Sequence, residues 1–296
     1  MSRSRPGWVS VVPALLLLLA LAGPAQAIEL DDVFPRAERS RPQPSAEELV
    51  RAAFDNLFGF DVAVRVESLT RQAGTVTARL RFWLCRKRFG PDTTRVVVAT
   101  RDDTADPRPT RMLQIDRGQG RIRSRLYAPQ VDPEPMSTSY RLTDPFLGAF
   151  SDRDAPEVRA DLSELVRAHE IVSLDLTRMG DAAVHRVGLR PLSARRYERV
   201  ELLIAVDEPL ILEYRYFEIG DPRASRVAQA PRAEMRTFEG HVLPGRMLYQ
   251  DRIQQTETEL TLRYEPLPNE GDALFMESSF HRAPMPGFSE EDASSR

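Results

Sequence analysis

The sequence predicts a mainly β fold, an incomplete antiparallel β-barrel of about eleven strands with an α-helical lid of short helices. Three observations predict this class. Many segments alternate apolar and polar residues with the period of two that half-buried strands show. Turn residues such as Gly74, Pro191 and Gly240 separate these segments at short spacing, which is typical of sequential hairpins. Helical patterns are confined to the start of the expected domain and to the middle of the chain.

Residues 1–27 have the order of a secretory signal peptide. Arg3 and Arg5 precede the apolar run 11–22, and Ala27 ends the small-residue A-x-A pattern at which such peptides are cleaved. The apolar core is shorter than the about 20 residues that span a bilayer. We therefore expect cleavage after Ala27 and a soluble periplasmic protein, and an uncleaved membrane anchor is the alternative.

Composition excludes several classes of protein. The 296 residues carry a net charge of −3 and are 42% hydrophobic, which is typical of a globular protein and not of a disordered chain. Because no basic domain is present, we expect no binding to nucleic acid. Cys85 is the single cysteine, which excludes a disulfide framework and a cysteine-based zinc site. In an oxidising compartment this cysteine is expected to be buried, and an intermolecular disulfide is the alternative.

The first structured element is expected to be a helix. Residues 28–44 are rich in proline, arginine and acids and predict an extended lead-in. Ser45 and Glu48 then have the spacing of a capping box, which indicates that a helix begins there. Gly59 ends the helical pattern, and the period changes to two.

Strand patterns fill most of the remaining chain. In chain order the expected strands are 60–67, 75–84, 95–100, 111–116, 121–128, 184–189, 197–206, 210–217, 233–238, 245–252 and 257–264. The segment 144–168 interrupts them with two short helices and resembles a lid. We expect residues 45–282 to form one domain and residues 283–296 to form a disordered tail.

No pattern of catalytic residues is present. The four histidines, His169, His185, His241 and His281, have no partners at metal-ligand spacing. A nucleophile elbow, a Ser-x-x-Lys motif and a phosphate-binding loop are absent from the sequence. We therefore expect no enzyme activity, metal or cofactor, and an exported hydrolase that uses scattered acids is the alternative.

A series of arginines allows two interpretations. It consists of Arg111, Arg117, Arg121, Arg123 and Arg125, and alternation places the last three on one face of a strand. They form either a patch for polyanions or headgroups, or part of a solvated outer face, and the second interpretation is preferred.

Apolar side chains gather on one side of many expected strands. A sheet of this extent must cover its apolar face, since an exposed one would promote aggregation. The face can form a dry core, which the close packing of protein interiors favours. It can also line a hydrophobic pocket under movable helices, and periodicity leaves both outcomes open.

An ordered set of motifs points to a known family. In the segment 140–154, Gly148, Phe150, Ser151 and Asp154 follow an arginine-bearing strand. The later motifs are the strand pair at 187–200, a Leu-Pro turn at 243–244, a strand of threonines and leucine at 256–260, and Phe280 with Arg282. In these motifs the sequence resembles the outer-membrane lipoprotein-sorting protein family, the LolA-like group, over most of residues 45–282.

The resemblance implies a half-barrel whose helices lie across a cavity that accepts acyl chains. It implies a carrier in outer-membrane lipoprotein sorting or lipid export, with lipid or lipoprotein acyl chains as ligands and an inner-membrane exporter of hydrophobic compounds as a partner. The alternative is an envelope-stress-type regulatory or sensor module of the same fold that binds a partner protein. The candidate lipid-binding residues are the inward strand positions and the lid positions Leu80, Phe82, Phe146, Leu147, Phe150, Leu202, Ile204, Leu212, Tyr214, Leu260 and Leu262.

Overall fold

The computed structural model describes most of the expected domain. The described residues are 44–90, 93–100, 110–117, 122–129, 131–138, 169–192, 197–267 and 271–285. All of them belong to one compact unit, residues 44–296. The expected signal peptide, the lid-like segment 144–168 and the motif at 140–154 lie outside the described residues.

Helix α3 (Ala46–Phe58) begins at the predicted capping box. The Ser45 hydroxyl oxygen accepts a hydrogen bond from the Glu48 amide at 3.2 Å, and the Glu48 carboxylate accepts one from the Ser45 amide at 2.8 Å. The Ser45 amide and hydroxyl both donate to the Glu48 carboxylate, and these two hydrogen bonds lower the pKa of Glu48. The helix ends at Gly59, where a Cβ atom would lie 2.4 Å from the carbonyl oxygen of Asp55. Both predicted ends of the helix are therefore confirmed.

Thirteen strands form one antiparallel sheet. They are β1 (Val62–Gln72), β2 (Thr75–Arg88), β3 (Thr94–Thr100), β4 (Thr110–Asp116), β5 (Ile122–Tyr127), β6 (Met136–Thr138), β7 (His169–Met179), β8 (Ala182–Pro191), β9 (Tyr197–Ala205), β10 (Ile211–Glu218), β11 (Arg226–Gln229), β14 (Arg246–Asp251) and β15 (Thr256–Glu265). Their order across the sheet is β6-β5-β4-β3-β2-β1-β15-β14-β11-β10-β9-β8-β7. Strands β12 (Met235–Phe238) and β13 (His241–Pro244) form a separate hairpin.

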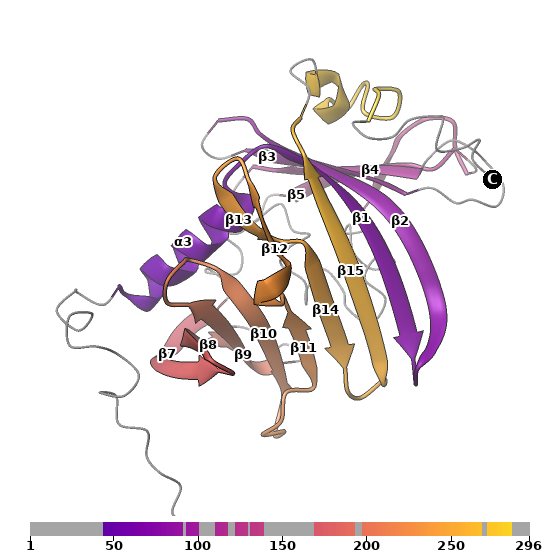
Figure 1. Ribbon diagram of the computed structural model, residues 1–296. Coiled ribbons are helices and arrows are strands. Elements are labelled where there is room, and N and C mark those ends of the chain that lie inside the picture. The colour runs from indigo at the N-terminus through magenta and orange to yellow at the C-terminus, as the bar shows by residue number, and fades with distance from the viewer. Residues whose placement is uncertain are drawn as a thin grey trace, which may run out of the picture. The chain divides into compact units, whose positions relative to one another are not determined.

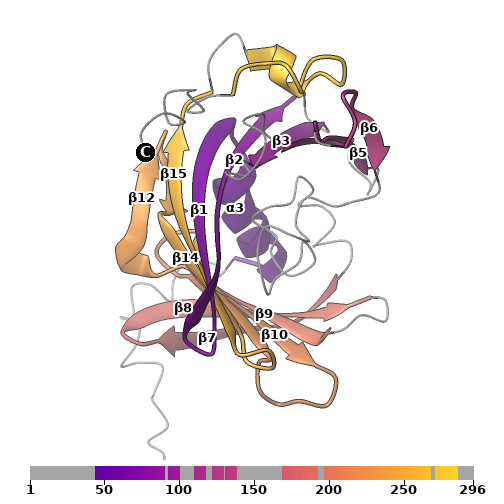
Figure 2. The same cartoon turned by 90° about the vertical axis from the view of Figure 1, so that its right-hand side faces the viewer.

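The large sheet is curved but not closed. Its edge strands, β6 and β7, do not pair with each other in the described part of the chain. The sheet bends around α3, so that the helix lies on its concave side (Figures 1 and 2). The predicted incomplete antiparallel barrel is therefore confirmed. We call the concave side the inner face and the convex side the outer face.

The structure contains four strands that the sequence did not predict. Strands β6, β11 and β13 have three or four residues each, which is too short to show a period. Strand β7 has 11 residues and forms an edge of the sheet. A register shift between Ile171 and Ser173 interrupts the alternation at its start, and the alternating part is limited to residues 173–177.

The largest apolar cluster joins α3 to the inner face. On the helix, Leu49, Val50, Ala53, Phe54 and Phe58 are buried. They pack with inward-facing residues from both halves of the curved sheet, including residues of β1, β2, β9, β10 and β15. The helix thus covers part of the apolar face that alternation predicted, and we call this group the inner cluster.

Part of the outer face is apolar as well, which the sequence analysis did not anticipate. Trp83 and Leu113 pack there under a C-terminal segment that includes the 3-10 helix Gly271–Phe275. Ala283 and Met285 are buried in the same cluster, although the sequence placed them in the tail. The packed chain therefore continues beyond the predicted boundary at residue 282.

The side chains of Cys85 and Arg111 are buried on this outer side of the sheet, and burial shifts the pKa of each. Cys85 is fully buried, as expected, and burial raises the pKa of its thiol to about 12. Arg111 is buried too, and its Nη1 donates hydrogen bonds to the carbonyl oxygens of Phe280, at 2.8 Å, and Ala283. Burial lowers the pKa of Arg111. The assignment of Arg111 to an exposed arginine series is therefore wrong, because this side chain anchors the C-terminal segment.

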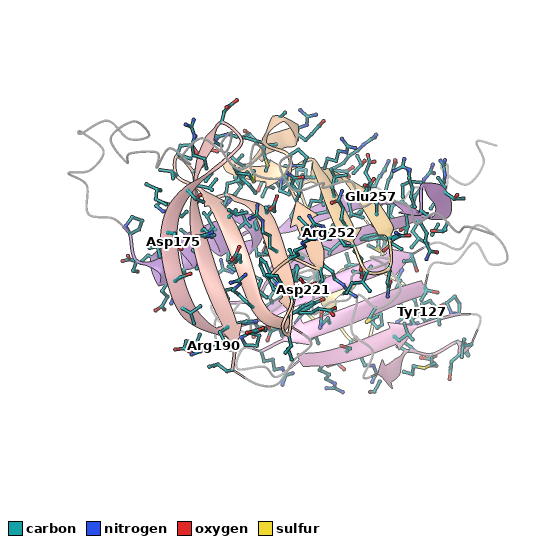
Figure 3. The ribbon with its side chains drawn as sticks, turned by 90° about the horizontal axis from the view of Figure 1, so that it is seen from below. Tyr127, Asp175, Arg190, Asp221, Arg252 and Glu257 are labelled. Carbon is teal, nitrogen blue, oxygen red and sulfur yellow. The ribbon has the colours of Figure 1, made fainter. Side chains whose placement is uncertain are left out.

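Exposed charges on the outer parts of the sheet are paired with opposite charges. Arg123 Nη1 lies 3.2 Å from Glu277 Oε1, and Arg186 Nη2 lies 3.1 Å from Asp175 Oδ2. Figure 3 shows Asp175 and Arg190 on the β7–β8 side of the sheet, seen from below. Pairs of this kind contribute about 0–1 kcal/mol each, and they are typical of a solvated face.

Candidate binding pocket on the inner face

A pocket lies between the end of α3, the β13 end of the hairpin and strands β1, β2, β14 and β15. The pairing register of the strands explains why side chains from β1, β2 and β15 line the same pocket. Val64 of β1 lies opposite Leu84 of β2 and Tyr264 of β15, so the three side chains point to the same face. The lining residues are Leu57, Phe58, Val62, Val64, Val66, Phe82, Leu84, Arg86, Leu243, Pro244, Met247, Tyr249, Leu260, Leu262 and Tyr264.

The pocket is narrow and almost entirely apolar. The empty space between its atoms is about 620 Å³, part of it open to solvent. Water in this space would find few hydrogen-bond partners among the aliphatic and aromatic walls. A slim apolar group fits this space better than a bulky ring system does.

The tyrosine hydroxyls of the lining already have partners. Tyr264 donates a hydrogen bond to the carbonyl oxygen of Pro244 at 2.8 Å. The Tyr249 hydroxyl lies 3.5 Å from the sulfur of Met247. The Tyr264 contact joins β15 to the hairpin, whereas the Tyr249 contact lies within β14, and both leave the pocket walls mainly apolar.

Arg86 is the charged residue of the lining, and its side chain is buried. Its Nη2 donates a hydrogen bond to the Leu57 carbonyl oxygen at 3.0 Å, and its Nε donates one to the Phe60 carbonyl oxygen at 3.4 Å. The guanidinium carbon lies 4.9 Å from the centre of the Phe58 ring. Burial lowers the pKa of Arg86 to about 10, so the side chain stays charged at neutral pH. Its charge also compensates the negative end of the α3 dipole.

Three of the predicted lipid-binding residues line this pocket, namely Phe82, Leu260 and Leu262. Leu202, Ile204 and Tyr214 belong to the inner cluster but lie outside the pocket lining. Alternation therefore placed these six residues on a common face, and only the three-dimensional arrangement separates them.

The other predicted residues do not join the pocket as it is described. Leu80 is half-buried and lies outside the lining. Leu212 packs on the opposite side of the sheet with Leu203 and Leu210, because a register shift after Ile211 reverses its orientation. The predicted lid residues Phe146, Leu147 and Phe150 lie outside the described residues.

Sequence reasoning missed Arg86 and the contribution of the hairpin. Arg86 continues the inward alternation of Phe82 and Leu84, but it lies two residues beyond the expected strand 75–84, whereas β2 continues to Arg88. Leu243 and Pro244 reach the pocket through a hairpin that packs beside α3, where the Asn56 side chain donates a hydrogen bond to the Val242 carbonyl oxygen at 2.8 Å. The periodicity of the sequence gives no indication of such a contact between distant segments.

The described residues show neither a metal-ligand cluster nor a helix that could span a membrane. No group of three or more metal-ligating side chains occurs there. Within the same residues, no helix has the length and apolar character needed to cross a bilayer.

Comparisons with known proteins identify the fold. The sequence matches no known family profile and no curated protein. The structure is similar to an outer-membrane lipoprotein-sorting protein domain from Vibrio parahaemolyticus, with a TM-score of 0.62, 14% identity and coverage of 80% of this chain and 100% of the other. A LolA superfamily protein from Nitrosomonas europaea gives a TM-score of 0.58 at 16% identity, with coverage of 79% and 98%.

A third solved structure agrees with these two. It is a DUF1329 family protein from Desulfovibrio piger, with a TM-score of 0.59, 16% identity and coverage of 77% of this chain and 97% of the other. Identities this low bear on architecture alone. The curved open sheet around a helix, together with these three similarities, shows that the chain has the LolA-like fold.

Proposed function

We propose that this chain is a periplasmic carrier, without a catalytic step, that holds an acyl chain of a lipid or lipoprotein in the inner-face pocket. The observation that carries the proposal is the lining, in which a single charged side chain occurs among fifteen. An acyl chain gains about 0.8 kcal/mol for each methylene that it buries. Several methylenes therefore supply useful affinity without any specific polar contact.

The test of ligand binding is native mass spectrometry of protein purified from its own periplasm. We expect bound lipid that a fluorescent fatty acid displaces, because both compete for the same apolar walls. Protein that is consistently empty and does not bind the fluorescent fatty acid would contradict the proposal.

A bulky substitution inside the pocket sharpens this test. Leu262 is half-buried and lines the pocket, so Leu262→Trp fills space while its neighbours can still adjust. Each displaced pair of methylenes costs about tenfold in affinity, at about 0.8 kcal/mol per methylene. The matched control is Val76→Trp on β2, which is exposed and outside the pocket. Equal affinities of the two variants for the fluorescent fatty acid would place binding elsewhere.

The periplasmic location rests on the signal-peptide pattern of residues 1–27. The intact mass of protein from the periplasmic fraction tests it, with the mature chain expected to begin at Ile28. A full-length mass in the cytoplasmic fraction would contradict both the cleavage site and the location.

A carrier must also receive and release its ligand at a membrane. An inner-membrane exporter of hydrophobic compounds is the proposed partner. Cross-linking in intact cells, followed by mass spectrometry, is expected to recover such an exporter, and recovery of soluble proteins alone would oppose this part of the proposal.

A further inference from the structure

Arg86 lies at one end of an apolar trough. On β1, Val62 lies opposite Arg86, whereas Ser68 lies opposite Leu260 further along the pocket. Strands rise about 3.3 Å per residue, so these two rows are roughly 20 Å apart along the strand. Between them the facing side chains are valine, leucine, phenylalanine and tyrosine. The pocket therefore has one charged end and a long apolar remainder.

No carboxylate of the described residues forms a salt bridge with Arg86, and Asp61, whose Oδ1 accepts a hydrogen bond from the Arg88 amide, acts on the charge of Arg86 only from a longer distance. The hydrogen bonds of Arg86 go to two neutral backbone carbonyls, of Leu57 and Phe60. By contrast, the buried Arg226 lies 2.8 Å from the carboxylate of Asp251. A buried charge without a counterion is costly, and an anion placed beside it recovers part of that cost.

We infer that the ligand carries an anionic oxygen group, a carboxylate or a phosphate, at the end of its acyl chain, and that Arg86 binds this group. The inference rests on the proposed carrier function and adds the chemical class of the ligand. The planar guanidinium suits both groups, because its parallel N–H donors match two oxygens on one carbon or phosphorus. The apolar chain would then run from Arg86 along β1 and β2.

A purely structural role for Arg86 makes a different prediction. If its only task is to cap α3, the pocket should bind an acid and a neutral molecule of the same chain length equally well. The net charge of the protein is −3, so its overall electrostatic field opposes an anion. A preference for the acid therefore requires a local positive charge in the pocket.

The experiment compares hexadecanoic acid, hexadecanol and a monoacyl phosphate as competitors of a fluorescent alkyl probe without charge. With the wild-type protein we expect the acid or the phosphate to bind about tenfold to a hundredfold more tightly than the alcohol, the range for hydrogen bonds to charged groups. The arm with the larger preference identifies the oxygen group. Binding of all three with equal affinity would overturn the inference and leave the carrier function standing, whereas binding of none would overturn the carrier function itself.

Two variants assign the preference to a residue. Arg86→Gln removes the charge and keeps a hydrogen-bond donor, and it should abolish the preference while the alcohol binds as before. The matched control is Arg88→Gln, because Arg88 lies on the same strand and also donates to a carbonyl at the end of α3, that of Gly59 at 2.8 Å, but it is exposed. Arg88→Gln should keep the preference. If Arg86→Gln does not fold, Arg86→Lys replaces it, with a preference that is reduced but retained, and an unchanged preference in either Arg86 variant would overturn the assignment.

Discussion

The buried ion pair between Arg226 and Asp251 joins β11 to β14, and its contribution to the free energy of unfolding can be tested quantitatively. These residues lie opposite each other on β11 and β14, and their side chains are 4% and 0% exposed. Arg226 Nε lies 2.8 Å from Asp251 Oδ2, while Asp251 Oδ1 accepts hydrogen bonds from the amides of Ile253 and Gln254, both at 2.9 Å. The Asp251 carboxylate thus links β14 to the short strand β11 and also stabilises the β14–β15 turn.

The informative change is Asp251→Asn, because the amide oxygen can still accept the two turn hydrogen bonds. What is lost is the negative charge that lies 2.8 Å from the buried guanidinium of Arg226. Removing one partner of a buried ion pair costs about 3–5 kcal/mol. Since domains are stable by about 5–15 kcal/mol, this is a large fraction of the free energy of unfolding. The corresponding fall in melting temperature is on the order of 10 °C.

Urea denaturation of the variant and of a matched control measures this cost. The control is Asp175→Asn, which breaks a cross-strand Asp–Arg pair of the same kind, with Arg186, at 48% and 41% exposure. Exposed pairs contribute about 0.2–1 kcal/mol, so the control should change the free energy of unfolding only slightly. If Asp251→Asn costs no more than the control, burial does not decide the strength of this pair and the reasoning is refuted.

Two further predictions concern stability, and the pocket variants tested above concern binding. Arg111→Gln should detach the C-terminal segment, because the buried guanidinium bonds the carbonyls of Phe280 and Ala283, and limited proteolysis should then cut near residue 280 much faster than in the wild type; an unchanged cleavage rate would contradict this. His185 is buried, and burial lowers its pKa from 6.5, so the unfolded chain binds a proton there at a higher pH than the folded chain does. The contribution of His185 to stability is therefore present above pH 6.5 and is lost as the pH falls through the lowered pKa, by at most about 1.4 kcal/mol per pH unit. Urea denaturation at several pH values should show a weaker pH dependence in His185→Gln than in the wild type, and equal pH dependence in both would count against it.

Much of the fold was predictable from local patterns. The helix at Ser45 follows from a capping box at its start and from a glycine at its C-terminal end. Most of the eleven predicted strands follow from alternation, since a half-buried strand exposes every second residue. Strands β3 and β4 are instead short runs that are buried on both faces. Strands of three or four residues left no such trace. The edge strand β7 alternates at residues 173–177 but not across its register shift at Ile171.

For the candidate site, the sequence predicted only which residues face the inner side of the sheet. Alternation identified Phe82, Leu260 and Leu262 as inward residues, and these line the pocket. It misplaced Leu212, because one register shift turns a side chain to the other side of the sheet. Alternation also puts Arg86 on the inward face of β2, but its burial was not predicted, because arginine side chains are almost never fully buried unless they are paired.

The sequence by itself determined the order of elements, the apolar face and the resemblance to the LolA-like group, because these depend on residue type and spacing along the chain. Tertiary structure decided which part of that face is a pocket and which part is packed core. It also decided that the outer face of β2 and β4 is covered by the C-terminal segment. These properties depend on curvature and on contacts between distant segments, which the period of a strand does not encode. The role inferred for Arg86 therefore depends on the apolar walls that the fold places around its charge.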